Sequence, residues 1–465
     1  MTLPILRDYQ DEAVHGIRAA FARGVRRVLF QGQTGMGKTV IFSYIAQSAN
    51  LKGNNVMVLV HRRELLNQAS RTFTDFDVPH GYIAAGKQSG EHEVYIASKD
   101  TLIRRTIPDI DLLVIDEAHH AVARTYQRII AKSKYVLGVT ATPCRMTGTG
   151  LGSVFDELIV GPQTRWLMNN GYLSDYKYFA PPVQMNLKRV KTTGGDYQRD
   201  MLAAEMDRAT ITGDAVGHYA KHLNGAPAIV FCVSVEHAHH CATMFSEAGF
   251  RAVAVDGGMD SVSRDAAIRD FAEGRINTLM SCDLVNEGLD VPGAYGAVML
   301  RPTKSLVICM QQWGRCLRPY GGKTHAIFLD HVGNCNMHGL PDDIREWSLE
   351  TGAVKPKRDD DAGISIRQCP KCYWVDASSK RQCTNCGFEF AVKTQDRRPS
   401  VVDGELVERV DTFTKEEKRD MIRQAKSYDD LLDVGKKLGY KPGWAWWMKE
   451  QRKKAASKYR SKVAK

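Results

Sequence analysis

The sequence predicts an α/β protein with two tandem domains, each built on a parallel β-sheet. Short apolar runs alternate with segments of helical period, the alternation resumes after a polar stretch at residues 181–196, and a glycine-rich loop follows the first apolar run. Apolar runs separated by helices are typical of parallel sheets covered on both faces. The 465-residue length also requires more than one domain, because single cores rarely exceed about 250 to 300 residues.

Each predicted element follows from a local pattern of apolar residues. In the first domain we expect strands at 27–30, 55–60, 94–97, 112–115 and 135–139, and helices at 39–49 and 64–73. In the second we expect strands at 228–232, 251–255, 278–280, 297–300 and 326–329, and helices at 235–248, 261–272 and up to 317. The domains are placed at 1–178 and 179–350, followed by a linker at 351–367, a cysteine module at 368–392 and a basic tail at 393–465.

The composition excludes a membrane protein and a disulfide scaffold. The chain is 43% hydrophobic and 25% charged, and no run approaches the roughly 20 apolar residues that a membrane helix needs. The N-terminus has no secretory pattern, so we expect a cytoplasmic protein without membrane contact. Seven of the eleven cysteines are scattered and four are clustered, and an odd total argues against complete disulfide pairing.

The positive charge is concentrated at the C-terminus. The net charge is +11, and residues 441–465 hold nine Lys and Arg against one acid, Glu450. A surplus of this kind suits a polyanionic partner such as nucleic acid. A solubilising terminus would have the same composition, so both interpretations stay open.

A phosphate-binding loop is the strongest single motif. The segment fits G-x-x-x-x-G-K-[ST] between a predicted strand and a predicted helix, which is the context that the motif requires. Its backbone N–H groups would surround phosphate oxygens, Lys38 would reach the β- and γ-phosphates, and Thr39 would offer its hydroxyl to Mg²⁺. The loop consists of Gly32, Gln33, Thr34, Gly35, Met36, Gly37, Lys38 and Thr39.

An acidic box, Asp116-Glu117-Ala118-His119, follows the apolar run 112–115. The carboxylates would emerge at the carboxyl end of a strand, where open α/β sheets bind ligands. We expect Asp116 to hold Mg²⁺ and Glu117 to orient or deprotonate the attacking water. Alone the box could be an exposed turn, but with the loop it indicates a site that hydrolyses a nucleoside triphosphate.

With these two elements, the chain resembles a superfamily 2 helicase of the DEAH type over nearly all of residues 1–350. The resemblance implies two RecA-like domains with ATP between them. In the first domain it implies adenine recognition by Arg7 and Gln10, nucleic-acid backbone contacts by His61, Arg62, Arg63, Ser98 and Lys99, and coupling by His119, Thr140 and Thr142. His119 is the expected relay to the second domain, and His120 is predicted to be a bystander.

The second domain supplies the other half of the motif set. Residues 229–234 occupy the motif IV position, and 286–292 resemble motif V, in which Gly288 and Asp290 are assigned to the nucleotide. Motif VI, Q-x-x-G-R-x-x-R, begins at Gln311, a coupling residue, and makes Arg315 and Arg318 the arginine-finger candidates. Taken alone, two such arginines could equally lie on a solvated helix face.

Residues 301–305, 329–334 and the cysteine module resemble RadD-type and related phage-encoded helicases, which act on DNA. Cys369-x-x-Cys372 and Cys383-x-x-Cys386 have the spacing of a zinc ribbon, whose four thiolates would hold a structural Zn²⁺. A redox-active pair is the alternative for these cysteines.

The tail combines aromatic and basic residues from 441 to 454. They could stack on bases and neutralise phosphates. Alternatively, Trp444 and Trp447, spaced i, i+3, could form a helix's core stripe against Leu431 and Leu432, and we favour this for the tryptophans.

The sequence therefore predicts a DNA helicase or translocase driven by Mg-ATP, with an RNA helicase as the alternative. A nucleotide-switched binding protein without motor activity also stays open, as does a subunit of a restriction enzyme. The expected partner is nucleic acid, DNA in preference to RNA. A replication or repair protein is a possible second partner. We expect a monomer or weak oligomer.

Overall fold

The computed structural model describes residues 5–87, 90–181, 187, 189–206, 211–282, 293–351, 366–390, 415–438, 440 and 443–452. The chain forms two compact units, residues 1–392 and 393–465. Motif V, with Gly288 and Asp290, lies outside the described residues.

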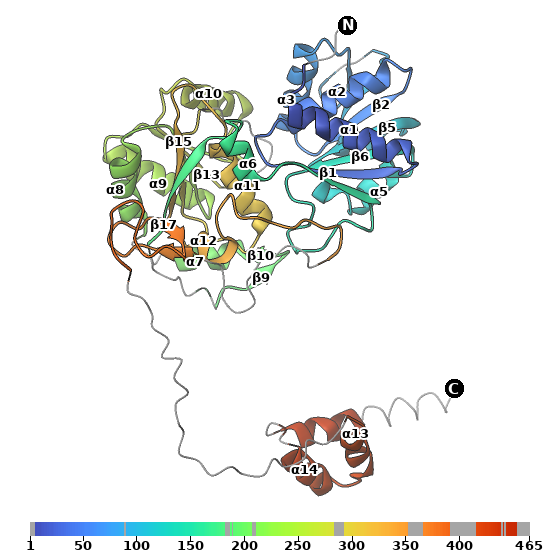
Figure 1. Ribbon diagram of the computed structural model, residues 1–465, viewed down its shortest axis with the longest axis vertical. Coiled ribbons are helices and arrows are strands. Elements are labelled where there is room, and N and C mark those ends of the chain that lie inside the picture. The colour runs from blue at the N-terminus through green and yellow to red at the C-terminus, as the bar shows by residue number, and fades with distance from the viewer. Residues whose placement is uncertain are drawn as a thin grey trace. The chain divides into compact units, whose positions relative to one another are not determined.

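The first domain contains a seven-stranded parallel sheet in the order β3-β4-β2-β5-β6-β1-β7 (Figure 1). Its strands are β1 (Arg27–Gln31), β2 (Val56–Val60), β3 (Gly81–Ile83), β4 (Val94–Ser98), β5 (Ile110–Asp116), β6 (Ser133–Thr140) and β7 (Glu157–Val160). Its helices are α1 (Asp8–Ala22), α2 (Lys38–Asn50), α3 (Arg63–Asp75), α4 (Lys99–Leu102) and α5 (Arg124–Ile130), with a 3₁₀ turn at Ala118–His120.

Alternate residues of this sheet enter two different cores. Val28 and Phe30 pack with residues of α1, α2 and α3, whereas Leu29 between them packs on the opposite face with α5. Both faces are therefore covered, as the apolar runs predict. The short strand β3 and the edge strand β7, whose residues are only partly buried, were not predicted.

The second domain contains a six-stranded parallel sheet in the order β12-β13-β11-β14-β15-β8. Its strands are β8 (Asp175–Phe179), β11 (Ala228–Phe231), β12 (Ala252–Val255), β13 (Thr278–Ser281), β14 (Gly296–Met299) and β15 (His325–Asp330). Its helices are α6 (Thr164–Asn169), α7 (Arg199–Met206), α8 (Ile211–Leu223), α9 (Val235–Glu247), α10 (Ser261–Ala272), α11 (Leu306–Cys316) and α12 (Asn334–His338). A hairpin of β9 (Thr192–Thr193) and β10 (Asp196–Tyr197) interrupts the order.

Strand β8 begins before the predicted domain boundary at 178, and it pairs with β15 at the edge of the second sheet. The chain also returns to the first domain after α12. Gly152 N–H donates to the carbonyl of Leu349 over 2.9 Å, and the Leu349 side chain packs on the core that contains α5. An ion pair of 3.0 Å between Glu64 on α3 and Arg264 on α10 adds a second contact between the domains.

The cysteine module packs against the edge of the second sheet. It contains the antiparallel strands β16 (Ile366–Gln368) and β17 (Val375–Ala377). Ala180 N–H, directly after β8, donates to the carbonyl of Tyr373 over 2.8 Å, and the Phe179 and Trp374 rings meet edge to face at 5.3 Å. The module is thus an extension of the second domain.

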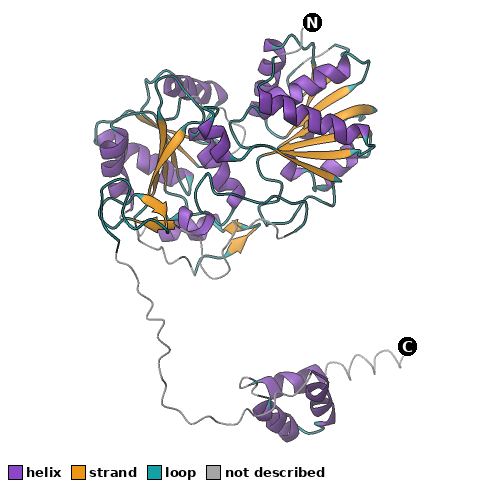
Figure 2. Ribbon diagram, viewed as in Figure 1, coloured by secondary structure: helices purple, strands orange, loops and turns teal. Residues whose placement is uncertain are grey.

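The tail unit is a small helical module of α13 (Lys415–Gln424), α14 (Tyr428–Lys437) and a helix at 444–452 (Figure 2). Leu431 and Ala445 form its core with Ala425, and Trp444 packs against this core. The predicted core stripe is wrong for Trp447, whose exposed fraction is 52%. Ala445 and Met448 take that place, because the buried face of the helix is turned by about one residue.

Candidate active site

The glycine-rich loop lies between β1 and α2, as predicted. Gly35 and Gly37 adopt φ angles of 91° and 86°, in the left-handed region that favours glycine. A Cβ on Gly37 would lie 2.6 Å from the Gln10 amide nitrogen. Lys38 and Thr39 form the first turn of α2, so the loop presents the N–H groups and the positive dipole end of a helix to an anion.

Helix α1 is tied to the loop by its first residues. The Tyr9 hydroxyl and the Gln10 amide both donate to the carbonyl of Met36, at 2.7 Å and 3.2 Å. The Gln10 side-chain oxygen in turn accepts from the backbone N–H of Arg7. The structure therefore brings Arg7 and Gln10 to the loop, as expected for residues that recognise the base.

An aromatic cluster beside α1 was missed by the sequence analysis. Tyr172 contacts Tyr9 at 4.7 Å between ring centroids and stacks on Trp166 at 5.9 Å. The Arg7 guanidinium lies 5.1 Å from the Tyr172 centroid. Flat rings beside Gln10 suit the face of a purine. Of these aromatic residues, only Tyr9 lies in a recognisable motif, because it directly precedes Gln10.

Lys38 and the acidic box form a buried charged group. Burial lowers the pKa of Lys38, and Glu117 and Asp116 oppose this effect. Burial and the neighbouring Glu117 raise the pKa of Asp116 to about 6, and Lys38 opposes this shift. Two carboxylates, one buried and one partly buried, therefore lie side by side next to Lys38. They fit a divalent cation, which Asp116 would hold together with the hydroxyl of Thr39.

The acidic box is connected to motif III. His119 Nδ1 lies 3.3 Å from both the Glu117 carboxylate and the Thr140 hydroxyl. The Thr140 hydroxyl donates to the carbonyl of Thr142 and accepts from the Thr142 N–H. His119 thus joins the acidic box to motif III within the first domain.

His120 does not stand apart from the site, contrary to the bystander interpretation. Its ring lies 4.2 Å from that of His119 and 4.6 Å from that of His61 in motif Ia. The three imidazoles therefore connect the acidic box to the candidate nucleic-acid residues.

Helix α11 of the second domain lies directly against the loop. A Cβ on Gly314 would come within 2.2 Å of Thr34 Cβ, and a Cβ on Gly35 would come within 3.3 Å of Arg318 Cγ. The charges of Arg318 and Arg315 both lower the pKa of Lys38, so both guanidinium groups lie near the phosphate site. Arg315 is only 7% exposed, which argues against a solvated helix face.

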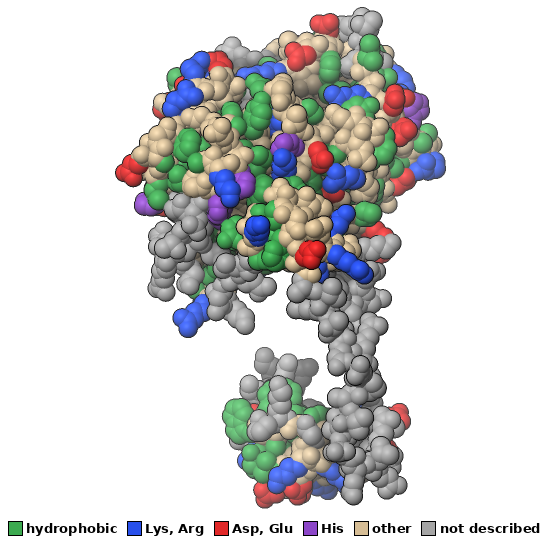
Figure 3. Space-filling view, turned by 60° about the vertical axis from the view of Figure 1, so that its left-hand side comes forward, with side chains coloured by type: hydrophobic (Ala, Val, Ile, Leu, Met, Phe, Trp, Pro, Cys, Tyr) green, Lys and Arg blue, Asp and Glu red, His purple; other side chains and the backbone are tan. Residues whose placement is uncertain are grey.

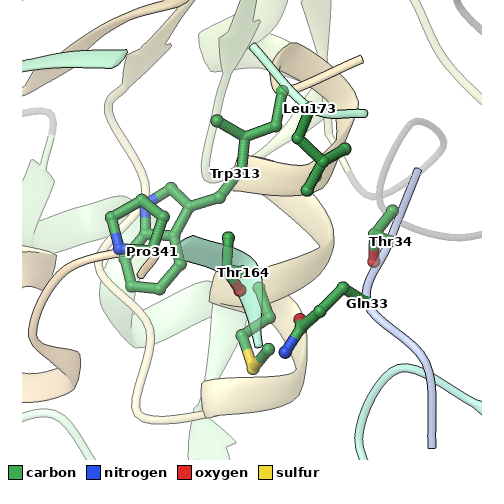
Figure 4. A pocket seen from close by; sticks show the side chains of 9 residues that line it. Gln33, Thr34, Thr164, Leu173, Trp313 and Pro341 are labelled. Carbon is green, nitrogen blue, oxygen red and sulfur yellow. The ribbon is translucent and has the colours of Figure 1, made fainter. Parts of the chain in front are cut away.

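Figure 4 shows the small pocket where the two domains meet. Gln33 and Thr34 of the loop face Trp313 of α11, with Thr164, Leu173 and Pro341 completing the wall. Gln311, the coupling candidate on α11, is buried at 3% exposure. Residues from both domains therefore line one cavity next to the loop.

The candidate nucleic-acid residues of the first domain all lie at the carboxyl ends of two neighbouring strands, β2 and β4. His61, Arg62 and Arg63 follow β2, whereas Ser98 ends β4 and Lys99 begins α4. Val60 pairs with Ser98 in the parallel register. Lys99 forms an ion pair of 2.8 Å with Asp100.

The four clustered cysteines converge, with Sγ–Sγ distances of 3.6 Å for Cys369–Cys386 and for Cys372–Cys383. All four sulfur atoms lie within 4.8 Å of one another. A tetrahedral Zn²⁺ with bonds of about 2.3 Å separates its sulfurs by about 3.8 Å, so the group fits zinc. Cys232, His237 and Cys241 form a second, incomplete group of this kind.

Comparisons with known proteins agree with this site. Residues 4–145 match the family model of the type III restriction enzyme res subunit, and residues 212–320 match the helicase conserved C-terminal domain. A 51.5 kDa protein of a Lactococcus phage is 36% identical over 78% of either chain. IRC3 of Saccharomyces cerevisiae, named as a candidate ATP-dependent helicase, is 31% identical over 71% of this chain and 52% of its own length.

A solved structure, the type ISP restriction-modification enzyme LlaBIII bound to DNA, superimposes with a TM-score of 0.54 at 17% identity. The match covers 71% of this chain and 28% of that enzyme, and it supports the tandem RecA-like fold. No helix in the described part of the chain is long and apolar enough to cross a bilayer. The chain is an ATP-hydrolysing enzyme that acts on nucleic acid. It belongs to the superfamily 2 helicases, in the family of the type III restriction enzyme res subunit.

Proposed function

We propose that this protein is a DNA helicase or translocase that couples Mg-ATP hydrolysis to movement on DNA or to its unwinding. The observation that carries the proposal is the contact between the loop of the first domain and α11 of the second. Thr34 and Gly314 meet without room for a methyl group, and Arg318 lies beside Gly35. The catalytic groups thus come from two bodies that must approach each other.

Each residue has a distinct task in this proposal. Bound Mg-ATP would supply the transferable phosphoryl group and a cation for Asp116 and Thr39 to hold. Lys38 neutralises phosphate charge, and Glu117 orients the attacking water. Arg315 and Arg318 stabilise the charge that develops during transfer, and they do so only when the domains are close together.

The coupling to nucleic acid follows the histidine connection. Glu117 touches His119, His119 touches Thr140, and the ring of His120 lies between those of His119 and His61. A change at the phosphate site can thereby shift the segment after β2, where Arg62 and Arg63 would contact the nucleic-acid backbone. Domain closure and reopening would then advance the strand.

DNA is proposed as the substrate on two grounds. The motif details resemble RadD-type and phage helicases, and LlaBIII, which shares the fold, has been solved bound to DNA. The chain spans 52% of IRC3 and 28% of LlaBIII, so the activities of those whole proteins are not transferred to it.

The cysteine module is proposed to hold structural zinc and to brace the second domain.

The deciding experiment measures the ATPase rate with single-stranded DNA, duplex DNA, forked DNA and RNA at one stated salt concentration, because phosphate contacts make affinity depend on salt. Many-fold stimulation by DNA supports the proposal, and stronger stimulation by RNA would favour an RNA helicase. Absence of stimulation would favour a nucleotide-switched binding protein. Lys38→Ala should abolish turnover and leave the fold intact.

A further inference from the structure

Of the three tryptophans in the helix at 444–452, one packs partly buried on the core of the tail unit and two are exposed. Trp444 packs on the core, and its ring lies 4.6 Å from that of Tyr440. Trp446 and Trp447 have exposed fractions of 59% and 52%. The helix therefore needs Trp444 for its packing, but its packing does not account for the other two.

Two adjacent exposed tryptophans are costly in water, because their large apolar surfaces stay hydrated. On a helix that buries Ala445 and partly buries Met448, residues 446 and 447 lie on the side away from the core. Both side chains are therefore accessible to a ligand in solution. We call Trp446 and Trp447 the tryptophan surface.

A basic side chain, Lys449, lies on the same helix as the tryptophan surface, and the surrounding sequence is basic. Lys449, one turn beyond Trp446, lies 4.7 Å from the ring centroid of Tyr428. The sequence from 441 to 465 holds nine basic residues, and Glu450 is its one acid. In Figure 3 the tail unit shows hydrophobic side chains gathered on one side, with both basic and acidic side chains at its lower end. Trp446, Trp447 and Lys449 thus lie within four residues of one helix.

We propose that the tail unit binds single-stranded nucleic acid, with Trp446 and Trp447 stacking on its bases and Lys449 neutralising a phosphate. Every base offers a π-face, so such a surface grips a strand regardless of sequence. The proposal rests on the proposed motor function, for which a separate grip would hold the strand while the two sheet domains open.

The charge distinguishes this occupant from a protein partner. Protein interfaces are enriched in tryptophan but depleted of lysine, particularly at their centres. Here Lys449 lies one turn from Trp446, in a segment whose net charge is positive and therefore opposite to that of nucleic acid. Single-stranded rather than duplex nucleic acid follows from the tryptophans, because bases in a duplex are already stacked on each other.

The test uses the full-length protein with Trp446→Ala and Trp447→Ala combined. Binding to a single-stranded oligothymidylate is measured by fluorescence anisotropy at fixed salt. We expect the double variant to bind at least about tenfold more weakly, the loss typical of removing a base stack. Replacement of both residues by phenylalanine should restore most of the affinity. Lys449→Gln should reduce the salt slope by about 0.7.

Two controls make the test specific. Leu432→Ala, at a residue of the same unit that is 38% exposed, should bind as the wild type does. An abasic oligonucleotide, which keeps the phosphates but lacks bases, should bind the wild type and the double tryptophan variant equally.

Unchanged binding of oligothymidylate by the double variant would overturn the proposal, as would an equal loss with the abasic strand. Neither result would touch the proposed function, which the nucleic-acid stimulation of the ATPase decides. Conversely, absence of stimulation with a clear tryptophan-dependent affinity would overturn the motor and leave the binding surface.

Discussion

Replacing Gly314 by alanine should slow ATP hydrolysis about 100-fold without unfolding the protein. The added Cβ would lie 2.2 Å from Thr34 Cβ and 2.4 Å from Thr34 Cγ2, whereas ordinary contacts are 3.4–4 Å. The helix and the loop must therefore separate by about 1.2 Å, which moves Arg318 away from the loop. A misplacement of about 1 Å can cost roughly 100-fold in rate, and we expect a loss of kcat of that order.

The assay compares steady-state ATPase rates and ATP affinity, because the two should respond differently. Lys38 and the loop stay intact in Gly314→Ala, so ATP binding to the first domain should change by only a few-fold. The matched control is Gly217→Ala on α8 of the same domain, where a Cβ meets nothing within 4 Å. This control should hydrolyse ATP at the wild-type rate.

A wild-type rate for Gly314→Ala would refute the reasoning, because it would mean that hydrolysis does not require the observed contact. A large loss for Gly217→Ala would also refute it, since the effect would then not be specific to the domain contact. Thermal unfolding of both variants excludes misfolding as the cause.

Three further predictions concern other parts of the molecule. Asp116→Asn should abolish hydrolysis yet raise the melting temperature of the nucleotide-free protein. Because the folded-state pKa of Asp116 is raised from 3.8 to about 6, its charged form lowers stability as pH rises through this window. The gain should therefore be larger at pH 8 than at pH 4, and an equal gain would contradict this origin. Metal analysis should find zinc in the wild-type protein. Cys372→Ser should lose this zinc and lower the melting temperature. Cys144→Ser, at a buried cysteine outside the cluster, should retain the zinc. Arg264→Ala and Glu64→Ala should each lower DNA-stimulated hydrolysis a few-fold, and the double variant no further, since both remove one ion pair.

The regular part of the fold could be predicted because its signal is local. Apolar runs such as 112–115 appear as buried strands, and α9 and α10 begin and end within one or two residues of their predicted bounds. Strand β8 could not be predicted, because Asp-Tyr-Lys-Tyr-Phe at a sheet edge carries no apolar run. Its burial comes from tertiary neighbours, namely β15, helices α8 and α11, and the cysteine module.

The linear motifs predicted the two halves of the site, but not how the halves touch. The Tyr172 and Trp166 rings reach α1 only through the segment between the domains, which no motif marks. Trp447 was assigned to a core by spacing alone, and i, i+3 spacing does not determine which of two neighbouring stripes faces inward.

A contact between the domains can nevertheless affect which residue a helix contains, as Gly314 shows. Gly314 lies inside α11, where glycine costs about 1 kcal/mol relative to alanine and no turn requires it. The structure explains the cost by the close approach of Thr34. The helix thus gives up stability so that the arginines can reach the loop. Gly314→Ala should then leave the fold of each domain intact and yet make the protein far less active, because the added Cβ acts on the contact between the domains.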